Sequence, residues 1–102
     1  MIKYFILNED HTVREVSFEE YSDWDSINEF KRRIARTELP SGILISTVFL
    51  GLDHNFGDEP PILFETMAFA HGNVSEDLCQ QRYNTYDEAI EGHNKVVEEM
   101  SK

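Results

Sequence analysis

Residues 46–69 read S-T-V-F-L-G-L-D-H-N-F-G-D-E-P-P-I-L-F-E-T-M-A-F, two apolar runs on either side of a polar loop. The runs cover residues 43–52 and 62–69 and are rich in Ile, Leu, Val, Phe and Thr, which favour β-strands. Residues 53–61 between them contain Asp, Asn, Gly and Pro, which end strands. Because both faces of each run are apolar, we expect central strands covered on both sides, or a sheet face buried in a homodimer.

The chain before this stretch begins with a predicted β-hairpin. Residues 2–7 form a short apolar run, and residues 8–11 have the composition of a turn. Residues 12–16, T-V-R-E-V, alternate in part between polar and apolar side chains, enough to predict a returning strand.

A helix and a second hairpin are expected next. Ser17 opens a capping box, S-F-E-E, and we expect the helix to end near residues 30–31. Residues 34–39 then pair with the strand that follows the turn at residues 40–42. The alternative is one continuous helix to Arg36.

The chain after the core stretch predicts a loop, an edge strand and a helix. Residues 71–77 are polar, and residues 80–84 read as a short edge strand. Thr85 opens the capping box T-Y-D-E, and the helix that follows has an apolar face that includes His93. A glycine costs about 1 kcal/mol in mid-helix, so Gly92 indicates close approach of another element. The sequence thus predicts a single α+β domain, residues 1–102, in which a mostly antiparallel β-sheet is covered by two helices.

Composition and charge limit the classes of function. The 102 residues hold 20 acidic and 9 basic side chains, a net charge of -11, which disfavours direct nucleic-acid binding. The charge has two readings: solubility alone, or contact with a basic partner. No run is long and apolar enough to span a membrane, so we expect no membrane association. The single cysteine, Cys79, excludes an internal disulfide and fits a reducing compartment.

The core stretch and the C-terminal helix resemble a widespread family of small bacteriophage and prophage proteins. The resemblance rests on T-V-F-L-G-L-D-H-N-F-G, P-P-I-L-F-E-T-M and R-Y-N-T-Y-D-E-A-I-E-G-H, and it covers roughly residues 46–96. Asp58-Glu59 departs from the small residues that family members usually carry before the two prolines. The resemblance implies a phage origin and action in the host cytoplasm, and it implies no reaction.

Six motif residues are the candidates for a binding site. They are Asp53, His54, Phe56, Glu65, Tyr83 and His93.

Four of the candidates, two carboxylates and two imidazoles, are of the types that bind a transition metal or act as general acid and base. Their spacing matches no metal or catalytic motif, so we expect no metal and no cofactor. The competing interpretation is a purely structural cluster. We expect the face with Glu65 to pack against the helix face with His93, near Asp53-His54. Glu65 should pair with His93, His54 or Arg82, because an unpaired buried carboxylate is costly.

Two further features have both a functional and a structural interpretation. Phe56 and the neighbouring prolines form either a recognition surface or a lid folded onto the core. The basic run of residues 31–36 either binds phosphates or keeps an edge strand soluble.

Three functions follow from these features. The first is a non-enzymatic phage accessory protein that binds a host or phage protein, as an acidic inhibitor of a host defence or nucleic-acid enzyme. The second is a protein that binds or sequesters a small, nucleotide-like ligand. The third is a small metal-dependent hydrolase.

Overall fold

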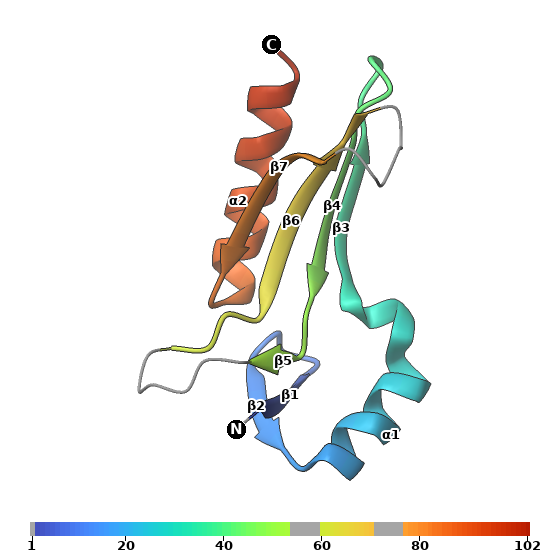
Figure 1. Ribbon diagram of the computed structural model, residues 1–102, viewed down its shortest axis with the longest axis vertical. Coiled ribbons are helices and arrows are strands. Elements are labelled where there is room, and N and C mark those ends of the chain that lie inside the picture. Colours follow the sequence, from blue (N-terminus) through green and yellow to red (C-terminus); the bar gives the residue numbers. More distant parts are fainter. Residues whose placement is uncertain (1, 54–59, 71–76) are drawn as a thin grey trace.

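The chain folds into two antiparallel sheets, each with its own helix (Figure 1). The computed structural model describes residues 2–53, 60–70 and 77–102. A three-stranded sheet has the order β2-β1-β5, and a four-stranded sheet has the order β3-β4-β6-β7. In chain order the elements are β1 (Lys3–Leu7), β2 (Val13–Val16), α1 (Phe18–Asn28), the 3₁₀ helix η1 (Glu29–Arg32), β3 (Arg33–Glu38), β4 (Leu44–Phe49), β5 (Leu52–Asp53), β6 (Phe64–Phe69), β7 (Asp77–Tyr83) and α2 (Tyr86–Met100).

The α+β class and both predicted hairpins are confirmed, since β1 pairs with β2 and β3 pairs with β4. The predicted helix starts are also confirmed: the side chains of Ser17 and Thr85 accept the backbone N–H three residues further on. The alternative of one helix to Arg36 is wrong, because β3 already begins at Arg33.

The apolar run of residues 43–52 is interrupted at Gly51, and this divides the strands between two sheets. Gly51 has φ +76, a left-handed conformation that favours glycine. A Cβ atom there would also lie 2.8 Å from the ring of Tyr21. The chain therefore turns after β4, and Leu52 pairs with Tyr4 in the small sheet.

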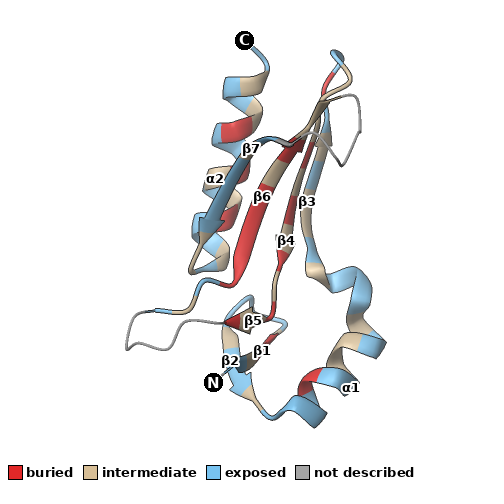
Figure 2. Ribbon diagram, in the orientation of Figure 1, coloured by how far each residue is buried: buried red, intermediate tan, exposed pale blue. Residues whose placement is uncertain are grey.

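Helix α2 covers one face of the four-stranded sheet, and most of the core lies between them, with Phe5 and Leu7 of β1 added from the small sheet. Figure 2 shows buried residues along β4, β6 and the inner side of α2, whereas α1 is mostly exposed. Two apolar clusters form this core. Phe5, Leu7, Phe49, Leu63, Phe64 and Ala89 make one, and Leu39, Ile45, Ala68 and Val96 make the other.

The opposite face of the four-stranded sheet has half-buried apolar residues such as Leu44, Val48 and Met67. Figure 1 shows α1 beyond the end of this sheet, so in the described part of the chain only α2 lies on a face of it. A homodimer formed through this face stays a prediction.

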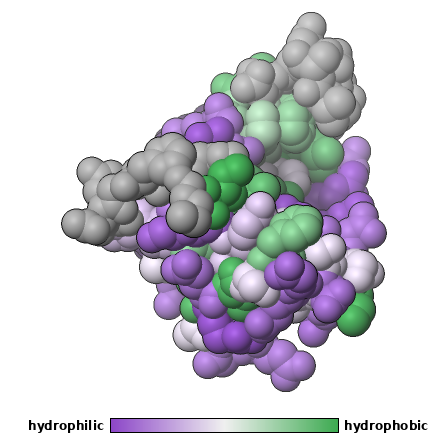
Figure 3. Space-filling view, turned by 60° about the horizontal axis from the view of Figure 1, so that its bottom comes forward, coloured by the Kyte–Doolittle hydropathy of each residue, from purple (hydrophilic) through white to green (hydrophobic). Residues whose placement is uncertain are grey.

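The surface is hydrophilic with scattered apolar side chains. Figure 3 shows separate hydrophobic patches on a largely hydrophilic end of the molecule. Phe18, Ile27 and Phe30 of α1 and η1 are 57%, 74% and 69% exposed. No described helix combines the length and the apolarity needed to cross a membrane.

Candidate functional site

His93 is buried between α2 and the sheet, where it joins three threonines. Its Nε2 lies 2.9 Å from Oγ1 of Thr37, and its Nδ1 lies 2.7 Å from Oγ1 of Thr47. Thr47 is in turn hydrogen-bonded to Thr66 on the neighbouring strand. The imidazole therefore links α2 to strands β3, β4 and β6.

Burial lowers the pKa of His93, so the neutral imidazole is favoured. A neutral imidazole has one N–H donor and one acceptor nitrogen, and the two threonine hydroxyls match that pair. Both ring nitrogens are thus occupied within the core. This arrangement stabilises the packing of α2 and leaves the ring with no free nitrogen for a ligand.

Glu65 lies on the other face of the sheet, and the prediction that it packs toward His93 is wrong. In the register of β4 and β6, Thr66 pairs with Thr47 and points toward α2, which places Glu65 on the opposite side. Of the three partners expected for Glu65, Arg82 is confirmed: Oε2 of Glu65 accepts hydrogen bonds from Arg82 Nε at 2.8 Å and from Gln80 Nε2 at 2.7 Å.

The remaining motif candidates lie apart from these two residues. Asp53 is buried in β5 of the small sheet, opposite Lys3 of β1. His54 and Phe56 fall outside the described residues, and so does the rest of the loop that carries them. Among residues 2–53, 60–70 and 77–102, no three His, Cys, Asp or Glu side chains lie close enough together to hold a metal ion. The described candidates therefore do not form one site.

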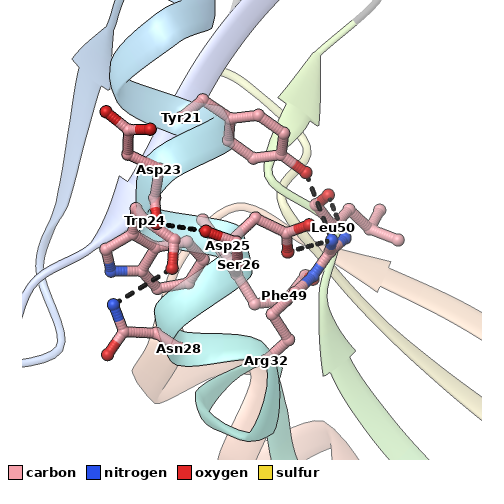
Figure 4. Close-up of polar contacts among 9 residues, drawn as sticks. All are labelled: Tyr21, Asp23, Trp24, Asp25, Ser26, Asn28, Arg32, Phe49 and Leu50. Carbon is pink, nitrogen blue, oxygen red and sulfur yellow. Dashed lines mark hydrogen bonds and ion pairs between the residues drawn. The ribbon is translucent and has the colours of Figure 1, made fainter.

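Arg32, the second residue of the basic run, has a structural role (Figure 4). Its guanidinium donates hydrogen bonds to the backbone carbonyls of Phe49 (3.1 Å) and Leu50 (2.7 Å). It also donates to the Tyr21 hydroxyl (3.2 Å) and forms an ion pair with Asp25 (2.8 Å). These contacts fix α1 and η1 against the end of β4, where the chain passes from one sheet to the other.

Tyr83 explains the mid-helix glycine and belongs to a groove. A Cβ atom on Gly92 would clash with the ring and hydroxyl of Tyr83, which confirms the predicted close approach beside His93. The Tyr83 hydroxyl is buried and has no hydrogen-bond partner among the described residues.

A groove of about 400 Å³ runs between β7 and α2, and we name it the β7–α2 groove. It is lined by Gln81, Tyr83, Glu88, Glu91, Gly92, Lys95, Val96 and Glu99. The three glutamates and Lys95 are exposed. Of these lining residues the sequence had singled out only Tyr83 as a binding candidate. The signal for the others was the acidic polar face of an amphipathic helix, which on its own indicates solvent exposure.

Comparison with family models, with curated proteins and with solved structures finds no match for this chain.

Proposed function

We propose that this chain is a non-enzymatic accessory protein that binds a basic, extended segment of a partner protein in the β7–α2 groove. The observation that carries the proposal is the position of the groove: a concave acidic surface lies directly beside a sheet edge. Within the described residues, β7 has a neighbouring strand on one side only.

The charge of the groove favours a basic ligand. Glu88, Glu91 and Glu99 line it, and Lys95 is the only basic residue in the lining. A partner's arginine or lysine placed between such carboxylates forms charge-assisted hydrogen bonds, the stronger kind. The net charge of -11 also attracts a basic partner from a distance.

The geometry of β7 favours an extended ligand. A free strand edge offers backbone N–H and C=O groups to an added strand, and alternate side chains of that strand then point to one face of the sheet. On the face covered by α2, those side chains would lie over the groove. An alternating basic sequence would therefore satisfy the backbone edge and the glutamates together.

The partner is proposed to be a host or phage protein met in the host cytoplasm, as the resemblance to phage proteins implies. His93 and Glu65, the buried polar candidates for catalysis, are both engaged in structural hydrogen bonds. This favours a binding function over a catalytic one. An inhibitor of a nucleic-acid enzyme fits this picture, because such enzymes present basic surfaces to phosphates.

A peptide that alternates arginine and threonine tests the proposal on ¹⁵N-labelled protein. We expect chemical-shift changes to concentrate on the amides of β7 and on Gly92, and affinity to fall roughly tenfold in the variant Glu91→Gln/Glu99→Gln. The matched control removes two exposed acids from α1, Glu19→Gln/Asp23→Asn, and should bind almost as the wild type does. Equal losses in the two variants, or shifts spread over α1, would show unspecific attraction and overturn the proposal.

A further inference from the structure

A second hollow, independent of the groove, lies where three distant segments of the chain meet. It is bounded by the β1–β2 turn, by the passage from η1 into β3, and by the start of α2, and it has a volume of about 280 Å³. We name it the turn pocket; its lining consists of Leu7, Asn8, Glu9, His11, Lys31, Arg33, Ile34 and Tyr86.

One wall of the turn pocket is a stacked pair of rings. The centroids of His11 and Tyr86 are 3.8 Å apart, and the ring planes differ by 10°. His11 has φ +71, the one non-glycine residue among those described with a positive φ. A side chain in that conformation is unfavourable and usually reflects a local requirement. Here the conformation places the imidazole flat against Tyr86.

The turn that holds His11 is well braced. The N–H of Asn8 donates to Thr12 O at 2.8 Å, and the N–H of His11 donates to Asn8 O at 3.0 Å. The hydroxyl and N–H of Thr12 both donate to Asp10, which holds the pKa of that carboxyl below its usual range. The stacked wall is therefore fixed before any ligand arrives.

The charge of the pocket contrasts with that of the whole chain. Lys31 and Arg33 both line it, although the chain has only 9 basic residues against 20 acids. Arg32, between them, points instead toward α1 and the end of β4. Glu9 is the one acidic residue in the lining, and it can accept hydrogen bonds from an amino group.

We infer that the turn pocket binds a nucleoside monophosphate. The inner faces of His11 and Tyr86 cover each other, so a base would stack on an outward face of this ring pair. Lys31 and Arg33 offer cations for a phosphate, and Glu9 offers an acceptor for base N–H groups. The volume of about 280 Å³ lies just below the roughly 300–1,000 Å³ of common ligand pockets, so it limits the ligand to the size of a mononucleotide or smaller. Repulsion from the acidic remainder of the chain is screened beyond about 8 Å at physiological salt.

Titration calorimetry with AMP, GMP, CMP and UMP tests this inference, with adenosine and inorganic phosphate as partial ligands. We expect at least one mononucleotide to bind, and each partial ligand to bind at least roughly tenfold more weakly. No binding of any mononucleotide at about 10 mM, or phosphate binding as tightly as the mononucleotides, would overturn the inference.

Three variants locate the binding. His11→Gly removes the ring and relieves the positive φ, so it should fold normally and bind roughly tenfold more weakly. Lys31→Gln/Arg33→Gln should lose binding to a similar or greater extent. Arg36→Gln removes a charge from β3, the strand of Arg33, but outside the pocket, and should bind as the wild type does. Unchanged binding by both the His11 and the Lys31/Arg33 variants would overturn the assignment.

Discussion

Replacing Arg32 with methionine removes the hydrogen bonds that join α1 to the end of β4 and keeps a side chain of similar length. The two bonds to the carbonyls of Phe49 and Leu50 come from a charged donor, a type worth roughly 1.5–3 kcal/mol each. The ion pair with Asp25 adds only about 0–1 kcal/mol, since the two side chains are 30% and 37% exposed. Taking the lower value for each carbonyl bond, we expect the free energy of unfolding to fall by about 3 kcal/mol.

Urea unfolding measures this loss, and Trp24, the single tryptophan, is a suitable probe because its ring packs against Phe49. The matched control is Arg36→Met, at an exposed position of β3, which should change stability by less than about 0.5 kcal/mol. A loss below about 1 kcal/mol for Arg32→Met would refute the structural role of the guanidinium.

Four further predictions follow from the packing of the sheet. Burial lowers the pKa of His93 in the folded protein, so below pH 6.5, the usual value, the unfolded chain binds more protons than the folded chain does. The stability that the neutral imidazole contributes is therefore present above pH 6.5 and is lost as the pH falls. Urea midpoints at several pH values should show a weaker dependence in His93→Gln, and an identical slope would contradict the assignment. Gly92→Ala should lower the melting temperature despite a gain of about 1 kcal/mol in helix propensity, since the new methyl group clashes with Tyr83; a raised melting temperature would show that the contact is loose. Glu65→Gln should lower the free energy of unfolding by about 1–2 kcal/mol, a modest loss because the side chain of its partner Arg82 is 57% exposed. Thermal melts measure this loss, and an unchanged melting temperature would show that the ion pair does not stabilise the fold. Light scattering should give twice the 11.9 kDa mass of one chain if the sheet face opposite α2, which no described helix covers, pairs with a second copy; the mass of one chain would exclude the homodimer.

The helix starts and the hairpins could be predicted because their signals are local. The capping boxes at Ser17 and Thr85 and the turn at residues 40–42 act within a few residues of chain. The division into two sheets could not be predicted. It depends on Gly51, which lies inside an apolar run that reads as one continuous strand, and on the contact of Gly51 with Tyr21 of α1.

The side of the sheet on which Glu65 lies was predicted wrongly for a physical reason. Both alternating faces of β6 are apolar, so hydrophobicity does not decide which one packs on α2. The deciding contact is the hydrogen bond between Thr47 and His93, which lies on the same face of the sheet as Thr66. That contact joins residues 46 positions apart, so no local sequence pattern predicts it.

The residues of the two proposed binding surfaces could be predicted only in part, for the same reason. Tyr83 and Gly92 could be identified from the motif and from the cost of a helix glycine. The pairing of His11 with Tyr86 arises only when the first turn reaches the last helix. The residue types indicate an acidic surface on α2 and a basic one at residues 31–36. Only the topology of the chain places these residues around the β7–α2 groove and the turn pocket.

The most direct test of the proposed function is the salt dependence of binding between this protein and the alternating arginine–threonine peptide. Calorimetry at about 50 mM and about 500 mM salt should show affinity falling at least tenfold, because the glutamates of the β7–α2 groove are exposed and their fields are screened. The Glu91→Gln/Glu99→Gln variant should show a smaller salt effect. An affinity that is the same at both salt concentrations would contradict recognition of a basic segment by this groove.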